Sequence, residues 1–167
     1  MKRLAALLVI MGGAMAIWGA TLTWVAVDYA VPGPNHQVVA LRYTRSGLQV
    51  GHGGWVIVAG AVLLGVGVAV ALVGPSRGIV APGILAAVVA GVPPMEWLAR
   101  SGAGGTSTGA APFVPLLGSL IALVGLCLAI PAGRRGRVAS LSAVIVGLAL
   151  LGAIVVGYDR PYYAPHF

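Results

Sequence analysis

The stretch WVIVAGAVLLGVGVAVALV, residues 55–73, contains nineteen consecutive residues without a charged or amide side chain. A membrane-spanning helix needs about 20 mostly apolar residues, because the hydrocarbon core of a bilayer is roughly 30 Å thick. The run ends at Gly74-Pro75-Ser76-Arg77, where two helix-breaking residues and a charge mark a boundary. Residues 55–73 are therefore predicted to form a transmembrane helix.

Other apolar runs of similar length lie on both sides of this stretch. Charged residues make up only 8 % of the 167-residue chain and the mean hydropathy is +1.01, whereas about 25 % of the residues of a soluble domain are charged. The fold class we predict is an all-α membrane protein, a single transmembrane domain (1–167) built as a bundle of five helices. The expected helices are 4–27, 55–73, 79–98, 112–130 and 138–157, with outer loops 28–54 and 99–111 and an outer tail 158–167.

The charges between the runs predict the orientation. With the N-terminus in the cytoplasm, the inner side carries six cations and no carboxylate, and all three carboxylates of the chain fall outside. This satisfies the positive-inside rule, so the net charge of +7 indicates topology and not nucleic-acid binding. We expect a multi-pass protein of a bacterial plasma membrane with its C-terminus outside. The inner cations are Lys2, Arg3, Arg77, Arg134, Arg135 and Arg137.

Two alternatives concern the first and third runs. The start resembles a secretory signal peptide, with Ala14-Met15-Ala16 as a cleavage pattern, but the apolar run continues to Val27, beyond the 7–15 residues of such a region. The third run contains Pro82, Pro93 and Pro94. A proline pair should kink or terminate the helix there, and a re-entrant segment is the alternative to a full span.

Runs two and four resemble each other at an offset of 58 residues. Gly51, Trp55, Gly60 and Gly67 match Gly109, Phe113, Gly118 and Gly125, which suggests a duplicated two-helix unit followed by one added helix. Small residues also recur at four-residue spacing, as Gly12, Ala16 and Ala20 in run one and Ala143 and Gly147 in run five. Such faces allow close helix packing, either within this bundle or against a larger partner.

Polar chemistry is concentrated on the outer side. Asp28, Glu96 and Asp159 each follow the outward end of an odd-numbered run, where a carboxylate opposes the helix dipole. We expect these acids to pair with nearby cations: Glu96 with Arg100, Asp159 with Arg160, and Asp28 with Arg42 or Arg45. These seven residues are the candidate outer-face interaction site, and the expected interfacial anchors are Trp24, Trp55, Trp97 and Tyr158.

Metal, cofactor and catalytic motifs are not recognisable. His36, His52 and His166 lack ligand spacing, and the sequence contains no GxSxG or HExxH pattern. No catalytic, cofactor-binding or metal residue is therefore assigned. The first outer loop contains a loosely alternating segment, residues 37–45. It is interpreted as a short strand or an interfacial segment, and a strand would need a neighbour within the protein or beyond it.

A family resemblance rests on three short motifs: Leu22-Thr23-Trp24 closing the first run, Ser46-Gly47 with Gly51 before the second, and the basic gap Pro75-Ser76-Arg77-Gly78. With these motifs, residues 1–137 resemble small actinobacterial membrane proteins of unknown function, including the tryptophan-biosynthesis-associated membrane protein family. The resemblance implies four helices, so the fifth run and the aromatic tail are departures, and it implies no catalytic residue. The nine arginines against one lysine are also typical of a GC-rich genome.

Taken together, these features favour a non-enzymatic accessory or scaffolding subunit of a larger plasma-membrane complex. Its expected partners are the lipid bilayer and other membrane subunits. A small passive channel or transporter, for instance as a homo-oligomer, is the alternative. The runs carry no buried charge, which argues against an ion-coupled carrier but leaves a passive pore open. An enzyme with a site on the outer face is the third hypothesis.

Overall fold

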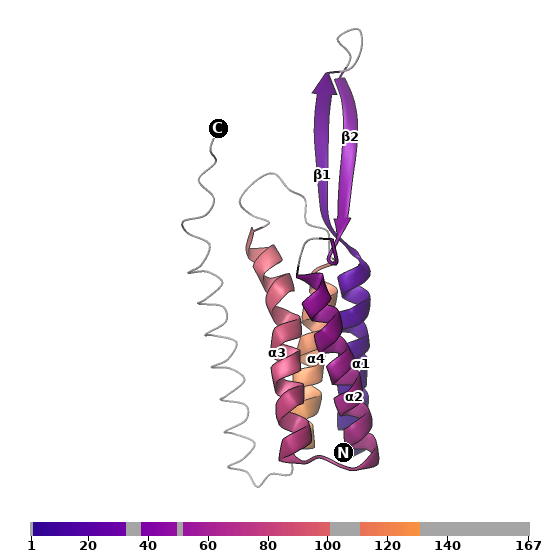
Figure 1. The fold of residues 1–167 in the computed structure, drawn as a ribbon, viewed down its shortest axis with the longest axis vertical. Helices are drawn as coiled ribbons and strands as arrows, with labels where there is room; N and C mark the ends of the chain where they lie inside the picture. Colours follow the sequence, from indigo (N-terminus) through magenta and orange to yellow (C-terminus); the bar gives the residue numbers. More distant parts are fainter. Residues whose placement is uncertain (1, 33–37, 50–51, 101–110, 131–167) are drawn as a thin grey trace.

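The computed structural model describes residues 2–32, 38–49, 52–100 and 111–130. In this part of the chain, four helices stand side by side in one bundle, and a two-stranded hairpin projects from one end of it (Figure 1). In chain order the elements are α1 (Lys2–Thr21), β1 (Thr23–Pro32), β2 (Val38–Ser46), α2 (Gly53–Leu72), α3 (Arg77–Arg100) and α4 (Phe113–Ala129).

Three of these helices, α1, α2 and α3, are long and apolar enough to cross a membrane. Twenty residues of α-helix extend about 30 Å, which matches the hydrocarbon thickness. Helix α4 has the same apolar character but is shorter, at 17 residues. The predicted class, a helical protein compatible with a membrane, is confirmed to this extent. The fifth expected helix, 138–157, and the tail 158–167 lie outside the described residues.

The first helix is shorter than predicted. Helix α1 ends at Thr21, and residues 23–27, expected to complete it, belong to β1. The prediction of a helix to Val27 is wrong because hydropathy does not distinguish an apolar strand from an apolar helix. The segment Thr23–Pro32 contains β-branched and aromatic residues at alternate positions, and it pairs with β2.

Helix α3 runs through its prolines without a break. It continues from Arg77 to Arg100 with Pro82, Pro93 and Pro94 inside. Of the two effects expected at the proline pair, a kink or an end, the helix does not end there. Both Pro93 and Pro94 are buried, where packing against neighbouring helices supports the weakened turn. A continuous helix of 24 residues is also long enough for a full span, which favours this over the re-entrant alternative.

The four helices form a closed ring of neighbours. Helix α1 packs against α2 and α4, and α3 packs against the same two helices. The chain turns directly from α2 to α3 through Gly74, whose φ of +104° is the left-handed conformation that glycine adopts at little cost. The amide groups of Val73 and Gly74 both donate to the carbonyl of Ala69 and so close the end of α2.

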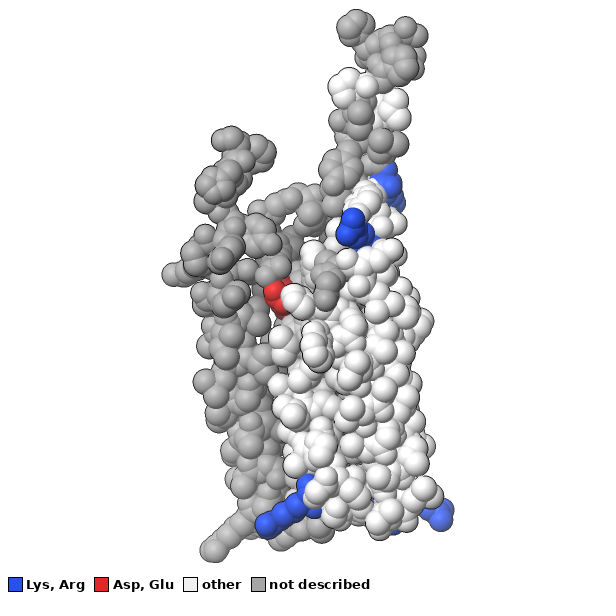
Figure 2. Space-filling view, in the orientation of Figure 1, with Lys and Arg blue, Asp and Glu red and all other residues white. Residues whose placement is uncertain are grey.

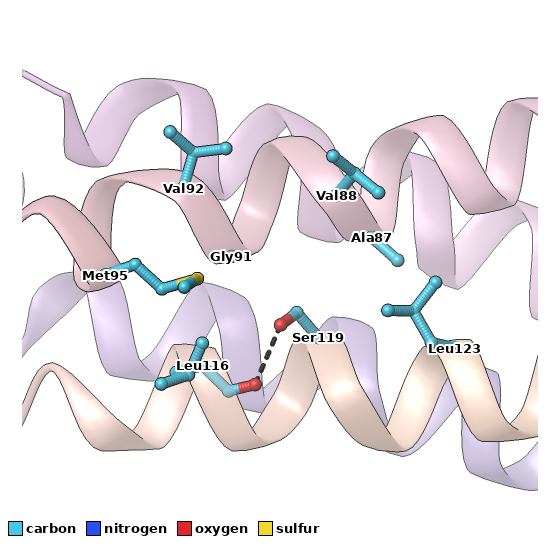
Figure 3. Close-up of a pocket in the computed structure, with 8 residues that line it drawn as sticks. All are labelled: Ala87, Val88, Gly91, Val92, Met95, Leu116, Ser119 and Leu123. Carbon is cyan, nitrogen blue, oxygen red and sulfur yellow. Dashed lines mark hydrogen bonds between the residues drawn. The ribbon is translucent and has the colours of Figure 1, made fainter. Parts of the chain in front are cut away.

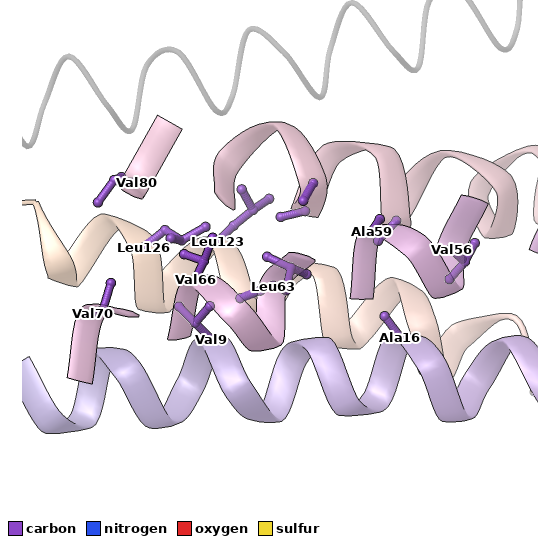
Figure 4. Close-up of a cluster of buried hydrophobic side chains, with 14 of the residues drawn as sticks. Val9, Ala16, Val56, Ala59, Leu63, Val66, Val70, Val80, Leu123 and Leu126 are labelled. Carbon is purple, nitrogen blue, oxygen red and sulfur yellow. The ribbon is translucent and has the colours of Figure 1, made fainter. Parts of the chain in front are cut away.

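The interior of the bundle is filled by small and medium-sized apolar side chains. All four helices contribute to one buried cluster, for example through Val9 of α1, Val66 of α2, Val80 of α3 and Leu126 of α4 (Figure 4). Val9 and Leu126 are completely enclosed. Helices in a bilayer gain little from hydrophobic burial, so in a membrane tight van der Waals packing of this kind would provide much of the cohesion.

Two of the three glycine pairs matched by the 58-residue offset occupy matching positions, and the third, Gly51 with Gly109, lies outside the described residues. A Cβ on Gly60 would lie 2.9 Å from the carbonyl oxygen of Gly13, and one on Gly118 would lie 2.7 Å from that of Gly12. Two helical turns further along, a Cβ on Gly67 would lie 3.2 Å from the carbonyl oxygen of Ala6. A Cβ on Gly125 would lie 2.8 Å from the carbonyl oxygen of Ala5. Helices α2 and α4 therefore approach α1 through equivalent glycines at equal heights.

The small-residue face predicted on run one is used inside the protein. Gly12, Ala16 and Ala20 are all buried among the described helices. This is the first of the two roles expected for the face, packing within the bundle. The corresponding pair in run five, Ala143 and Gly147, lies outside the described residues.

Candidate functional site: the hairpin and its base

The outer loop between α1 and α2 forms an antiparallel hairpin of β1 and β2. The alternating segment 37–45 is thus a strand from Val38 onward, and its neighbour is supplied by the chain itself. The register places Asp28 opposite Arg42 and Val25 opposite Arg45. Of the two cations expected to pair with Asp28, Arg42 is the one that the register brings beside it. Because Asp28 lies in a strand beyond the end of α1, the helix-dipole role expected for it is wrong.

Trp24 attaches the hairpin to the bundle. The pairing register shifts between Thr23 and Val25, so Trp24 is the extra residue of a β-bulge. A bulge bends a strand and redirects a side chain. The indole is fully buried, and its Nε1–H donates a 2.8 Å hydrogen bond to the carbonyl oxygen of Gly19 in the last turn of α1. The bulge therefore directs the Trp24 side chain into the bundle, where its indole caps the end of α1. We call this buried indole the Trp24 wedge.

The segment after β2 closes over this wedge. A Cβ on Gly47 would lie 2.5 Å from the Trp24 ring, so only glycine fits there. The Gly47 amide donates to the carbonyl of Leu22, and the Leu48 amide donates to that of Ala20. Gly53, at the start of α2, then donates to the carbonyl of Gly47. Backbone hydrogen bonds thus join the end of α1, the hairpin base and the start of α2 into one unit.

Tyr43 and Arg45 form an exposed pair on β2. Residues two apart in a strand lie on the same face, and the Arg45 Nε–H donates to the Tyr43 hydroxyl. The guanidinium carbon lies 5.0 Å from the centre of the Tyr43 ring, within the range of a cation–π contact. With Thr44 and Gln49, this pair lines an open hollow of about 400 Å³ beside the hairpin base.

The described charges gather at the two ends of the molecule. Figure 2 shows basic side chains near the hairpin base and at the opposite end of the bundle. One acidic patch lies toward the hairpin end, and the described surface between it and the other end is uncharged in this view. The acidic residue is Glu96; the basic residues are Arg42 and Arg45 at the hairpin end and Lys2, Arg3 and Arg77 at the other. Such a band of uncharged surface suits the hydrocarbon core of a bilayer.

Glu96 lies opposite His52 at the hairpin end of the bundle. The carboxylate Oε2 is 3.8 Å from His52 Nδ1, and the histidine and glutamate side chains are 55 % and 22 % exposed. The contact links the first turn of α2 to the last turns of α3 and is ionic when the imidazole is protonated. The expected partner Arg100 ends α3, but its side chain is outside the description. Asp159 and Arg160 also lie outside the described residues.

The tryptophans expected as interfacial anchors have three different environments. Trp55 is 62 % exposed near the start of α2, and Trp97 is half-buried against the core. Trp24 is fully enclosed and presents no surface to lipid. The repeat partner of Trp55, Phe113, is likewise 55 % exposed. Tyr158 lies outside the described residues.

Two further hollows lie between helices and are apolar. One, between α3 and α4, is narrow; Ser119 faces it, but its hydroxyl donates a 2.7 Å hydrogen bond to the carbonyl of Leu116 (Figure 3). The other is an open groove between α2 and α3, of about 260 Å³, with Trp55, Pro82 and Leu85 among its walls. Neither carries an ionisable side chain among its lining residues.

The hollow beside the hairpin base is lined by hydrogen-bonding side chains and one cation, Arg45, which suits binding. Within the described ranges, no three His, Cys, Asp or Glu side chains converge on a position for a metal ion. Sequence reasoning found Arg42 and Arg45 but missed Tyr43, Thr44 and Gln49 beside them. The spacing of Tyr43 and Arg45 on an alternating segment was the available signal, because it puts both side chains on one face.

Comparison of the chain with protein-family models, with curated proteins and with solved structures finds no match. The resemblance to the tryptophan-biosynthesis-associated membrane protein family therefore stays a prediction.

Proposed function

We propose that this chain is a non-enzymatic accessory or scaffolding subunit of a larger bacterial plasma-membrane complex. The observation that carries the proposal is the hairpin, an arginine-bearing ribbon that projects from the bundle and is held at its base by the buried Trp24 (Figure 1). A two-stranded hairpin is only marginally stable by itself in water. A chain that anchors such a ribbon so firmly is suited to presenting it to another protein.

The packing of the helices supports this role over a passive channel. Trp24 and Leu63 are fully enclosed, and glycine contacts bring the backbones of α1, α2 and α4 together. A water-filled path would need polar groups or open space along the bundle axis. Within the described helices, that axis is occupied by valine, leucine and alanine side chains.

We place the protein across the plasma membrane with Lys2, Arg3 and Arg77 in the cytoplasm and the hairpin outside. The support is the positive-inside rule together with the uncharged band between the two charged ends (Figure 2). In this placement the fifth run would form a further span and the C-terminus would be extracytoplasmic. The expected membrane partners then meet the hairpin on the outer side and the exposed helix faces within the bilayer.

Purification from native membranes tests the proposal. The tagged chain, expressed at its normal level and extracted in mild detergent, should co-purify with at least one integral membrane protein in near-stoichiometric amount. A matched sample in strong denaturing detergent should lose that companion. A free monomer in every mild detergent, with no companion after cross-linking in intact cells, would contradict the proposed function. Solute flux through vesicles containing the pure protein would favour the channel instead.

A further inference from the structure

The hollow lined by Tyr43, Thr44, Arg45 and Gln49 offers hydrogen-bond donors for an anion. The Nε–H of Arg45 donates to the Tyr43 hydroxyl, and the guanidinium lies beside the Tyr43 ring. Its terminal N–H groups have no partner among the described residues. Gln49 uses its Oε1 to accept the Ser46 amide at 3.0 Å, which leaves its NH₂ group as a donor. The lining residues contain a positive charge and no carboxylate.

The same residues lie along the edge of a sheet. The described sheet has two strands, β1 and β2, so the outer edge of β2 carries backbone donors and acceptors that no described strand pairs. An extended segment of another protein can add to such an edge, with backbone hydrogen bonds supplying affinity and side-chain sites supplying specificity. The hollow beside Arg45 is positioned to supply that specificity.

Charge selects the occupant. Arg42 and Arg45 are exposed and lie three residues apart on β2, so they project from opposite faces of the strand. Arg42 lies opposite Asp28 in the pairing register, so Arg45 is the cation that selects the occupant, and an acidic side chain is the one that this cation favours. A planar guanidinium presents parallel N–H groups that suit the two oxygens of a carboxylate.

We propose that the β2 edge and the Arg45 hollow together capture an acidic, extended segment of the partner subunit, with a carboxylate bound by the Arg45 fork. This inference rests on the proposed function and names the contact through which it would operate. The partner segment would form a third strand on β2 and place an Asp or Glu in the hollow lined by Tyr43, Thr44 and Gln49.

A photo-reactive amino acid at Thr44 tests the contact in intact cells. The full-length chain should cross-link to an extracytoplasmic segment of an integral membrane protein, and mass spectrometry should map the link beside an Asp or Glu. Arg45→Glu should lower that product at least tenfold, and Arg45→Lys should lower it less. Reversing the mapped acid to Arg should restore the product with Arg45→Glu. Arg3→Gln, a cation at the other end of the bundle, is the matched control and should leave it unchanged.

Several outcomes would overturn the inference without touching the proposed function. These are a link only to lipid, a link to a second copy of this chain, a link to a segment without acids, or no restoration by the charge swap. The same holds where no cross-link forms. If the companion membrane protein still co-purifies with the Arg45→Glu chain in any of these cases, the complex assembles through another surface. Loss of every companion from the unmodified chain would instead mean that the proposed function itself has failed.

Discussion

Gly118 of α4 lies directly against the backbone of Gly12 in α1, because a Cβ on Gly118 would lie 2.7 Å from the Gly12 carbonyl oxygen. The same hypothetical Cβ would lie 3.0 Å from the backbone nitrogen of Ala16. Neither neighbour is a flexible side chain that can move aside. This contact sets how closely the two helices approach, and so how well the rest of their interface packs.

Replacing this glycine should therefore separate the helices. Gly118→Ala is expected to lower the free energy of unfolding by about 1–3 kcal/mol, the usual cost of forcing an extra carbon into a packed interior. Gly65→Ala is the matched control, because a Cβ there meets nothing within 4 Å. Unfolding of both variants in the same detergent would measure the difference. Equal effects at the two positions would contradict the close contact.

The hairpin should loosen when its wedge is removed. Trp24→Ala is expected to cost about 3–5 kcal/mol, as large-to-small changes at buried aromatic residues do, and it also leaves the Gly19 carbonyl without its indole donor. Trypsin cleaves after arginine, so faster cleavage at Arg42 and Arg45 in the folded protein reports the loosening. We expect at least a tenfold increase in rate.

Trp55→Ala is the control for this change, because Trp55 is 62 % exposed. It should leave the rate of tryptic cleavage in the hairpin close to that of the unmodified chain. Trp24→Phe separates packing from hydrogen bonding. It keeps most of the ring and loses the N–H, for an expected cost of about 1–3 kcal/mol. An unchanged cleavage rate in Trp24→Ala would show that the hairpin is held by other contacts.

The helices were predictable because lipid demands long apolar runs, and such runs are visible in sequence. The runs at 55–73 and 112–130 differ from α2 and α4 by only one or two residues at each end. The matched glycines were also visible, and their common approach to α1 gives the 58-residue offset a structural meaning. The tight approach of Gly118 to Gly12, however, depends on which helices become neighbours.

The second strand of the hairpin could be predicted from its alternating sequence, but the first strand could not. An apolar stretch such as Trp24–Val27 continues the hydropathy of α1, so it reads as helix until its strand partner is known. The decision between the two is tertiary: β2 supplies the pairing and the bulge turns Trp24 inward. Likewise, Glu96 was expected to contact a cation four residues along its own helix. That prediction stays open, because the side chain of Arg100 lies outside the described residues. The contact of Glu96 with His52, at the start of another helix, could not be read from the sequence.

The His52–Glu96 pair should contribute little to stability. The histidine side chain is 55 % exposed, and ion pairs in contact with water are worth about 0–1 kcal/mol. A double-mutant cycle with His52→Ala and Glu96→Ala should give a coupling energy in this range, and added salt should reduce it. A coupling that is large and insensitive to salt would place the pair in a drier environment than the structure shows.

The last prediction concerns the side of the membrane on which the hairpin lies. A hairpin with exposed backbone edges is not tolerated in contact with hydrocarbon, so it must lie in water on one side of the membrane. The positive-inside rule, applied to the cations at the other end, predicts that this side is the outside. In a Cys127→Ser background, Gln49→Cys should react with a membrane-impermeant maleimide in intact cells, and Ser76→Cys, in the α2–α3 turn, only after permeabilisation. The opposite pattern would place the N-terminus outside, and the arginines of β2 would then face the cytoplasm, where an extracytoplasmic partner could not reach them.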